Sequence, residues 1–159
     1  FTLHAEGRIN PFEWQHSVGD FEKIINRGLA GVKDDIEKSK QAHKSDASAL
    51  EFLQTQTDLC DAIIQRAHMG AEKALEKATE TEKQDYKGNL IRLSKGLKKV
   101  PEQPAENFYE AVLSLYFCYP FIPDSIGLID RYLYPFYISF YFTFLVSYSL
   151  TCAHYCTYQ

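Results

Sequence analysis

Apolar residues recur every three or four positions along four stretches of the chain, which is the pattern of an α-helix with one buried face. The spacing predicts helices over residues 20–42, 46–79, 82–99 and 105–119. Asp20 precedes the first helix and Ser45 or Asp46 the second, where an oxygen can accept hydrogen bonds from the unpaired first-turn amides. Four α-helices and no clear strand in this part make the chain mainly α.

The prolines predict where the later helices begin and end. Pro101 ends the third helix, because the residue before a proline avoids the helical region. Pro104 is expected to open the fourth, since its ring suits a first turn. Pro120 and Pro123 are expected to stop the fourth helix. Gly28 and Gly31 lie inside the first helix at a cost in stability, so we expect close packing against another element there.

The second helix is the longest and the most clearly amphipathic. Its apolar face is expected to comprise Ala49, Phe52, Leu53, Cys60, Ile63, Ile64, Ala67, Ala71, Ala74, Leu75 and Ala78. Tyr86, Leu90, Leu93 and Leu97 form the face of the third helix, and Phe108, Ala111, Val112, Leu115 and Tyr119 that of the fourth. The alanines of the second helix favour close packing in a helical array, with a coiled coil as the alternative.

The last part of the chain has a different composition. Residues 132–159 contain no Asp, Glu, Lys or Arg, yet hold 11 of the 22 Phe and Tyr residues. The aromatic and β-branched side chains of residues 138–150 favour strand over helix. Residues 138–156 approach the length of a bilayer span, but their hydroxyl groups and the lack of a basic flank argue against one. We expect residues 132–159 to pack poorly and to drive aggregation.

Composition then narrows the classes of function. The chain has 159 residues, a net charge of −4 and a pI of about 5.7, which argues against a nucleic-acid or anionic-membrane partner. Four cysteines do not make a disulfide framework and suit a reducing cytoplasm. Because the chain begins at Phe1 without a signal peptide, we expect it to be a piece of a longer protein.

No metal or nucleophile site emerges from the residues alone. Cys152 and Cys156 around His154 match half a zinc site without a second half. Cys60 and Cys118 lie on apolar helix faces and are expected to be buried. His16 is a loop histidine that either is solvated or points into a pocket and hydrogen-bonds a polar substrate.

Three strings are specific enough to suggest a family. Trp14 to Val32 reads WQHSVGDFEKIINRGLAGV, the second string runs from Val100-Pro101 to Glu110-Ala111, and the third from Ser125 to Tyr137 reads SIGLIDRYLYPFY. Their order and motifs resemble those of the pyruvate formate-lyase-like glycyl radical enzymes. The resemblance covers about residues 10–137 and has helical spacers between the strings.

The resemblance implies a fold, a chemistry and partners. The family fold is a ten-stranded α/β barrel wrapped in helices, of which this chain would supply part of the helical wrapping. A backbone glycyl radical, installed by an iron–sulfur activating enzyme that uses S-adenosylmethionine, generates a thiyl radical that attacks the substrate. Family members cleave C–C or C–N bonds or eliminate water in an anaerobic cytoplasm, and the intact enzyme is expected to be a homodimer.

The residues that match or depart from the family motifs limit what can be carried over. His16 matches a family histidine that contacts substrate hydroxyls, so the resemblance implies a substrate-binding role for it. The His-Ser pair of the diol-dehydrating members is Ile122-Pro123 here, which argues against a glycerol-like substrate. The sequence contains neither the Gly-Cys-x-Glu loop nor the Arg-Val-x-Gly-Tyr motif. No catalytic residue, metal ligand or bound cofactor is therefore assigned to this chain.

Two interpretations follow. In the first, residues 1–137 are a partial pyruvate formate-lyase-like domain, inactive alone, followed by an aberrant or frame-shifted tail at residues 138–159. Its partners would be the remainder of the enzyme and the activating enzyme. In the second, the chain is a non-catalytic helical interaction module, with the tail as a membrane anchor.

Overall fold

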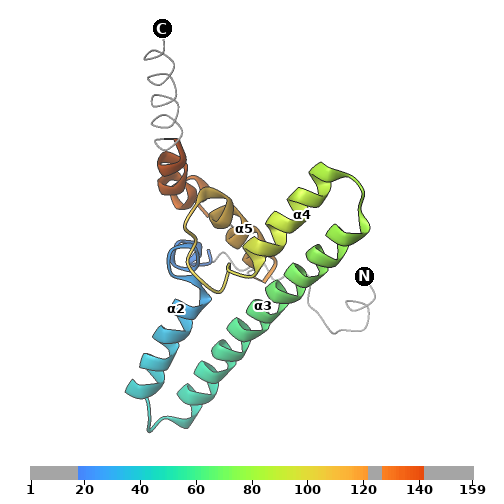
Figure 1. Cartoon of the computed structure of the whole chain (residues 1–159). Helices are drawn as coiled ribbons and strands as arrows, with labels where there is room; N and C mark the ends of the chain where they lie inside the picture. The colour runs from blue at the N-terminus through green and yellow to red at the C-terminus, as the bar shows by residue number, and fades with distance from the viewer. Residues whose placement is uncertain (1–17, 122–126, 142–159) are drawn as a thin grey trace, which may run out of the picture.

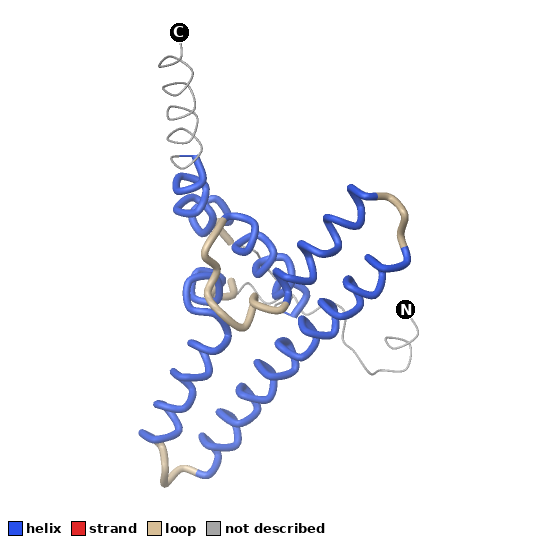
Figure 2. Tube along the Cα trace, in the orientation of Figure 1, coloured by secondary structure: helices blue, strands red, loops and turns tan. Residues whose placement is uncertain are grey.

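A computed structural model describes residues 18–121 and 127–141. The helices are α2 (Phe21–Ala42), α3 (Ala47–Glu80), α4 (Gln84–Leu97) and α5 (Phe108–Cys118), followed by the short 3₁₀ helix η1 (Tyr119–Phe121). Residues 129–141 are also helical. The described part of the chain contains no β-strand (Figure 2), which confirms the mainly α prediction.

The helix caps explain where most of these helices begin. Asp20 and Asp46 each accept a hydrogen bond from a first-turn amide, at 3.0 Å, as predicted. The fourth helix was predicted to open at Pro104 but begins at Phe108, because the Asn107 side chain accepts from the Glu110 amide at 3.0 Å. An Asn with a Glu three positions later is a cap signal that local sequence contains.

The helices form an array around α3 (Figure 1). α2 runs beside the first half of α3, and α4 folds back along the second half, where Ala74, Ala78 and Leu90 pack together. α5 contacts both α2 and α4. Because α3 packs against different helices along its length, the helical array predicted from its alanines is what the structure has.

One core joins α2, α3, the end of α4 and α5. Its fully buried side chains include Phe21, Ile25, Ala71, Val100 and Cys118. Six residues of the predicted face of α3 are buried: Cys60, Ile63, Ala67, Ala71, Ala74 and Ala78. Five residues predicted to face the core are instead exposed: Phe52, Leu75, Tyr86, Val112 and Tyr119. They lie where no neighbouring helix among the described residues covers that side.

The helix at residues 129–141 corrects the expectation of strand from residue 138 onward. Residues 138–141 are helical, and the rest of the tail lies outside the described residues. Tyr132, Leu133 and Phe136 of this helix pack against the core, so this start of the uncharged segment is better packed than predicted. Core contacts of the preceding turns outweigh the weak strand preference of aromatic residues.

Within the described ranges, none of the helices combines the length and the apolar character needed to cross a bilayer.

Candidate functional site

The first helix is kinked at Gly28, within the first family-like string. Gly28 has φ 67° and ψ 170°, so the helical residues on either side run in different directions. A Cβ at this position would lie 2.6 Å from the carbonyl carbon of Gln103, hard against the backbone of the turn after α4. Both the backbone angles and the space therefore require glycine here.

Backbone hydrogen bonds fasten the first string to the second at this kink. The Leu29 amide donates to the Pro101 carbonyl at 2.8 Å, and the Ala30 amide donates to the Glu102 carbonyl at 3.0 Å. On the other side of the kink, the Ala105 amide donates to the Ile25 carbonyl at 2.9 Å. These bonds pair main-chain groups of α2 that the kink removes from the helix ladder, so the two strings form one unit.

Side chains support the kink from two directions. Arg27 donates to both carboxylate oxygens of Asp35 and to the Gly31 carbonyl, so it bridges the two halves of α2. The guanidinium of Arg27 lowers the pKa of the Asp35 carboxyl. From α3, His68 Nε2 lies 3.1 Å from Glu102 Oε2 and ties the turn to the central helix.

The third string packs beside the start of the first. Tyr132 and Phe21 have ring centroids 6.4 Å apart. A Cβ on Gly127, whose φ is 66°, would lie 2.5 Å from both the Tyr132 hydroxyl and a methyl group of Val18. The beginning of the first string and the beginning of the third therefore touch, and Tyr132 holds them together. We call this contact, with the Gly28 kink, the string junction.

The predicted substrate-binding residue, His16, and the two positions that align with the His-Ser pair of the diol-dehydrating members lie outside the described ranges. His16 is two positions before Val18 in sequence, and Ile122 and Pro123 lie in the segment between Phe121 and Gly127. The structure therefore does not test the substrate-binding role of His16. It does bring together the positions from which both segments depart, Val18 and Gly127.

An ion-pair cluster closes the start of α5 next to the second string. Lys99 Nζ lies 2.8 Å from carboxylate oxygens of both Glu106 and Glu110. The Glu106 amide also donates to Glu110 at 2.9 Å. Burial raises the pKa of the Glu110 carboxyl, but the hydrogen bonds from Lys99 and the Glu106 amide outweigh it, so that pKa is lowered overall. The Glu110 carboxylate is thus charged and serves as a cap.

Cys60 and Cys118 are buried free thiols, as predicted. Burial raises the pKa of the Cys118 thiol to about 12 and also raises the pKa of Cys60. Both lie inside helices that pack in the core, which is unlike an exposed loop thiol that takes part in radical transfer. Cys152, His154 and Cys156 lie outside the described residues, and the described ones hold no cluster of three potential metal ligands.

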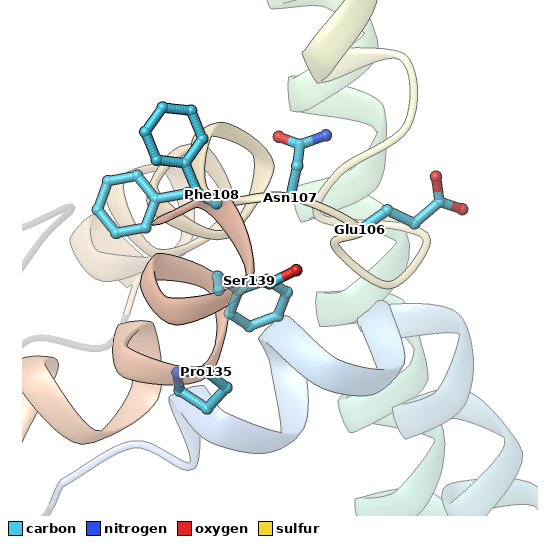
Figure 3. Close-up of a pocket in the computed structure, with 7 residues that line it drawn as sticks. Glu106, Asn107, Phe108, Pro135 and Ser139 are labelled. Carbon is cyan, nitrogen blue, oxygen red and sulfur yellow. The ribbon is translucent and has the colours of Figure 1, made fainter. Parts of the chain in front are cut away.

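A surface pocket of about 450 Å³ separates the second string from the helix of the third (Figure 3). It is lined by Glu106, Asn107, Phe108, Pro135, Phe136, Ser139 and Phe140. Phe108 packs edge-on against Tyr137, with centroids 6.2 Å apart, at the side of this pocket. The lining is mostly apolar, without the converging charged groups that would hold a polar substrate in place.

Comparison with known proteins defines the class. Residues 12–139 match the pyruvate formate lyase-like family, so the chain belongs to that family. It is 34% identical over 139 residues to the isethionate sulfite-lyase of Bilophila wadsworthia, covering 79% of this chain and 16% of that protein. A probable dehydratase of Escherichia coli is 21% identical over 146 residues, covering 85% of this chain and 18% of that protein.

Solved structures agree with the match. A structure described for 1,2-propanediol dehydration in Roseburia inulinivorans superposes with a TM-score of 0.74 at 30% identity, covering 79% of this chain and 17% of that one. The glycerol-bound B12-independent glycerol dehydratase from Clostridium butyricum gives 0.69 at 25% identity, covering 76% and 17%. This chain is thus the helical part of a glycyl radical enzyme fold and spans about one sixth of its relatives' length.

Proposed function

We propose that this chain is the N-terminal helical portion of a glycyl radical enzyme of the lyase or dehydratase type. Its task in the intact enzyme is to hold the substrate-facing segments at the edge of the barrel. The observation that carries the proposal is the string junction, where Gly127 lies against both Val18 and the Tyr132 side chain. The segments that leave from these two positions contain His16 on one side and residues 122–126 on the other.

His16 is the substrate-binding residue of this proposal. A neutral imidazole can donate one hydrogen bond and accept another, which suits a hydroxyl-bearing substrate. Ile122 and Pro123 bring no polar side chain to the other segment, so the substrate class differs from that of the diol-dehydrating members. The relatives include both a sulfite-lyase and a glycerol dehydratase. In this proposal, residues in the rest of the enzyme determine whether a C–S or a C–O bond is cleaved.

The chemistry itself comes from outside these residues. The radical glycine and its cysteine belong to the remainder of the enzyme, and an S-adenosylmethionine-dependent activating enzyme installs the radical. The burial of Cys60 and Cys118 supports this proposal, because a buried thiol cannot exchange hydrogen with a substrate. We also propose a cytoplasmic homodimer for the intact protein, and a domain limit after Tyr137, with residues 138–159 as a separate tail.

A chimera tests the proposal. Residues 12–137 would replace the matching segment of the Bilophila wadsworthia isethionate sulfite-lyase, followed by anaerobic activation with that enzyme's own activating enzyme and S-adenosylmethionine. We expect the glycyl radical doublet in the electron paramagnetic resonance spectrum, together with turnover of the relative's substrate. The 159-residue chain alone, treated in the same way, should give no doublet.

His16→Ala in the chimera separates binding from radical formation. The doublet should persist while turnover falls about 10- to 100-fold, since a polar substrate group loses its partner. His43→Ala changes an exposed histidine in the turn after α2 and should alter neither. A chimera that folds but never acquires the radical contradicts the proposal for the chain, and full turnover by His16→Ala contradicts the role of His16.

A further inference from the structure

The segment around α4 is basic although the chain as a whole is acidic. Residues 83–99 contain six Lys and Arg side chains and a single carboxylate, Asp85, whereas the full chain has a net charge of −4. Arg92, Lys95 and Lys99 follow one another at single-turn intervals along α4 and past its end. Side chains three or four positions apart lie on the same helix face, so these three cations form a row.

This row borders a pocket of about 410 Å³ between α4 and α5. Its lining consists of Arg92, Lys95, Gly96, Lys99, Asn107, Tyr109 and Glu110. Gly96 allows the helices to approach closely, because a Cβ there would lie 2.6 Å from Leu113 and 3.3 Å from the Tyr109 ring. The pocket is thus lined by a glycine, an aromatic ring and a row of cations.

Of the three cations on the rim of the pocket, Arg92 and Lys95 form no ion pair with a described carboxylate. Lys99 is neutralised by Glu106 and Glu110, each at 2.8 Å. Arg92 stacks over Tyr109, with its guanidinium carbon 4.0 Å from the ring centroid, which fixes the guanidinium in position. Among the residues that the structure describes, neither Arg92 nor Lys95 has a carboxylate within ion-pair distance.

We propose that the Arg92–Lys95 rim is a docking surface for an acidic segment of a partner protein. The Arg92 guanidinium, 4.0 Å from the centroid of the Tyr109 ring, has N–H groups that can donate to a carboxylate, and Lys95 one turn away takes the next carboxylate along the partner chain. Nucleic acid fits less well, because Arg92 already covers the Tyr109 ring that would stack on a base.

Peptide binding to the full 159-residue chain tests this surface. A fluorescein-labelled peptide with six glutamates separated by alanines is the probe, and the same peptide with glutamine in place of glutamate is its control. Fluorescence anisotropy should show binding of the glutamate peptide only. Because the chain carries a net charge of −4, attraction of a polyanion requires a local site and cannot arise from overall charge. Raising NaCl from 50 to 300 mM should weaken binding roughly tenfold.

Charge-matched variants locate the surface. Arg92→Gln should weaken binding about tenfold and Lys95→Gln about threefold. Lys44→Gln, in the turn between α2 and α3, removes the same charge elsewhere and should leave binding unchanged. Tyr109→Leu, which keeps every charge but frees Arg92, should give an intermediate loss. Far-ultraviolet circular dichroism checks that each variant is folded.

Three results would overturn the proposal. The first is equal binding of the glutamate and glutamine peptides. The second is an equal loss in Lys44→Gln and Arg92→Gln. The third is tighter binding of a six-nucleotide single strand than of the glutamate peptide, which would assign the rim to nucleic acid. None of these outcomes depends on radical chemistry, so the surface stands or falls separately from the proposed function.

Discussion

The two ends of α2 are held in place by different kinds of interaction. At the kink, main-chain groups of residues 25–30 bond to main-chain groups of residues 101–105. Beyond the kink, side chains connect α2 to α3: Lys33, near the middle of α2, pairs with Asp61, and Lys40, in its last turn, donates to Gln54 and Thr57. The backbone hydrogen bonds require glycine at one position, Gly28, whereas the side-chain contacts require particular polar residues. Because these side chains are partly exposed, we expect their contacts to contribute less to stability.

The family-like strings fall at the kink end. Gly28, Pro101 and Ala105 all belong to the strings, and each has a position that the backbone geometry of the junction requires. Neither Lys33 nor Lys40 lies in a string, although both make well-formed contacts. In this chain, three string residues, Gly28, Pro101 and Ala105, therefore meet the backbone requirements of the kink.

The largest effect is expected from Gly28→Ala, which tests the backbone pairing at the kink. The substitution should lower the free energy of unfolding by about 3–5 kcal/mol, because alanine both strains the backbone at φ 67° and collides with residues 102–103. Urea denaturation measures the loss. Gly88→Ala is the matched control: nothing lies within 4 Å of its Cβ position, so alanine in mid-helix should stabilise by about 0.5–1 kcal/mol. Equal urea midpoints for Gly28→Ala and the parent would show that α2 does not require glycine at this position.

The buried thiol of Cys118 is expected to make the stability of the fold depend on pH. Its pKa is raised from 9.0 to about 12 by burial, so the folded state keeps a proton that the unfolded chain releases. Stability is therefore fully present below pH 9 and is lost as the pH rises toward 12, by roughly 2–4 kcal/mol. Between pH 8 and pH 11, the urea midpoint should fall further for the parent than for Cys118→Ala. Parallel decreases in the two proteins would rule out this thiol as the cause.

Glu110 gives a smaller effect with the opposite pH direction. Its pKa is lowered in the folded state, so its contribution is present above its ordinary value of 4.5 and is lost as the pH falls through the folded value. Glu110→Gln should cost about 1–2 kcal/mol at pH 7. Thermal unfolding measured from pH 7 down to pH 3 should show this difference shrinking. A difference that stays constant would mean that the carboxylate charge contributes nothing.

The smallest expected effect comes from the side-chain contacts between α2 and α3 beyond the kink. Lys33→Gln should reduce stability by about 0.5 kcal/mol or less, because the side chains of Lys33 and Asp61 are 35% and 54% exposed and water screens the pair. Addition of 0.5 M NaCl should abolish the difference in urea midpoint. A loss as large as that of Gly28→Ala would reverse the ranking of the two ends.

Local signals made most of the fold predictable. The apolar stripes and the caps Asp20 and Asp46 act within one or two helix turns, and the helices follow them closely. Asn107 and Glu110 carried a similar signal that the proline at 104 obscured. The exposure of Phe52 and Tyr86 was not predictable, because a stripe shows which face is apolar and not whether a neighbour reaches it.

Long-range partners account for what was missed at the junction. Close packing against another element was expected at Gly28 and at Gly31; the structure confirms it at Gly28, whereas the atoms nearest to Gly31 belong to Arg27 of the same helix. The kink itself depends on residues 101–105, more than seventy positions away, and no helical periodicity contains that information. The His68–Glu102 and Arg92–Tyr109 pairs also join residues of different elements, 34 and 17 positions apart. His16 stays a prediction from the family resemblance.

Amide hydrogen exchange is the most direct test of the string junction. The amides of Leu29, Ala30 and Ala105 bond across it. They should exchange as slowly as the core amides of α3, that is, only through global unfolding. The amides of the 43–46 turn at the outer end should exchange orders of magnitude faster. If Leu29, Ala30 and Ala105 instead exchange at the rate of that turn, the junction is not a fixed unit and the account is wrong.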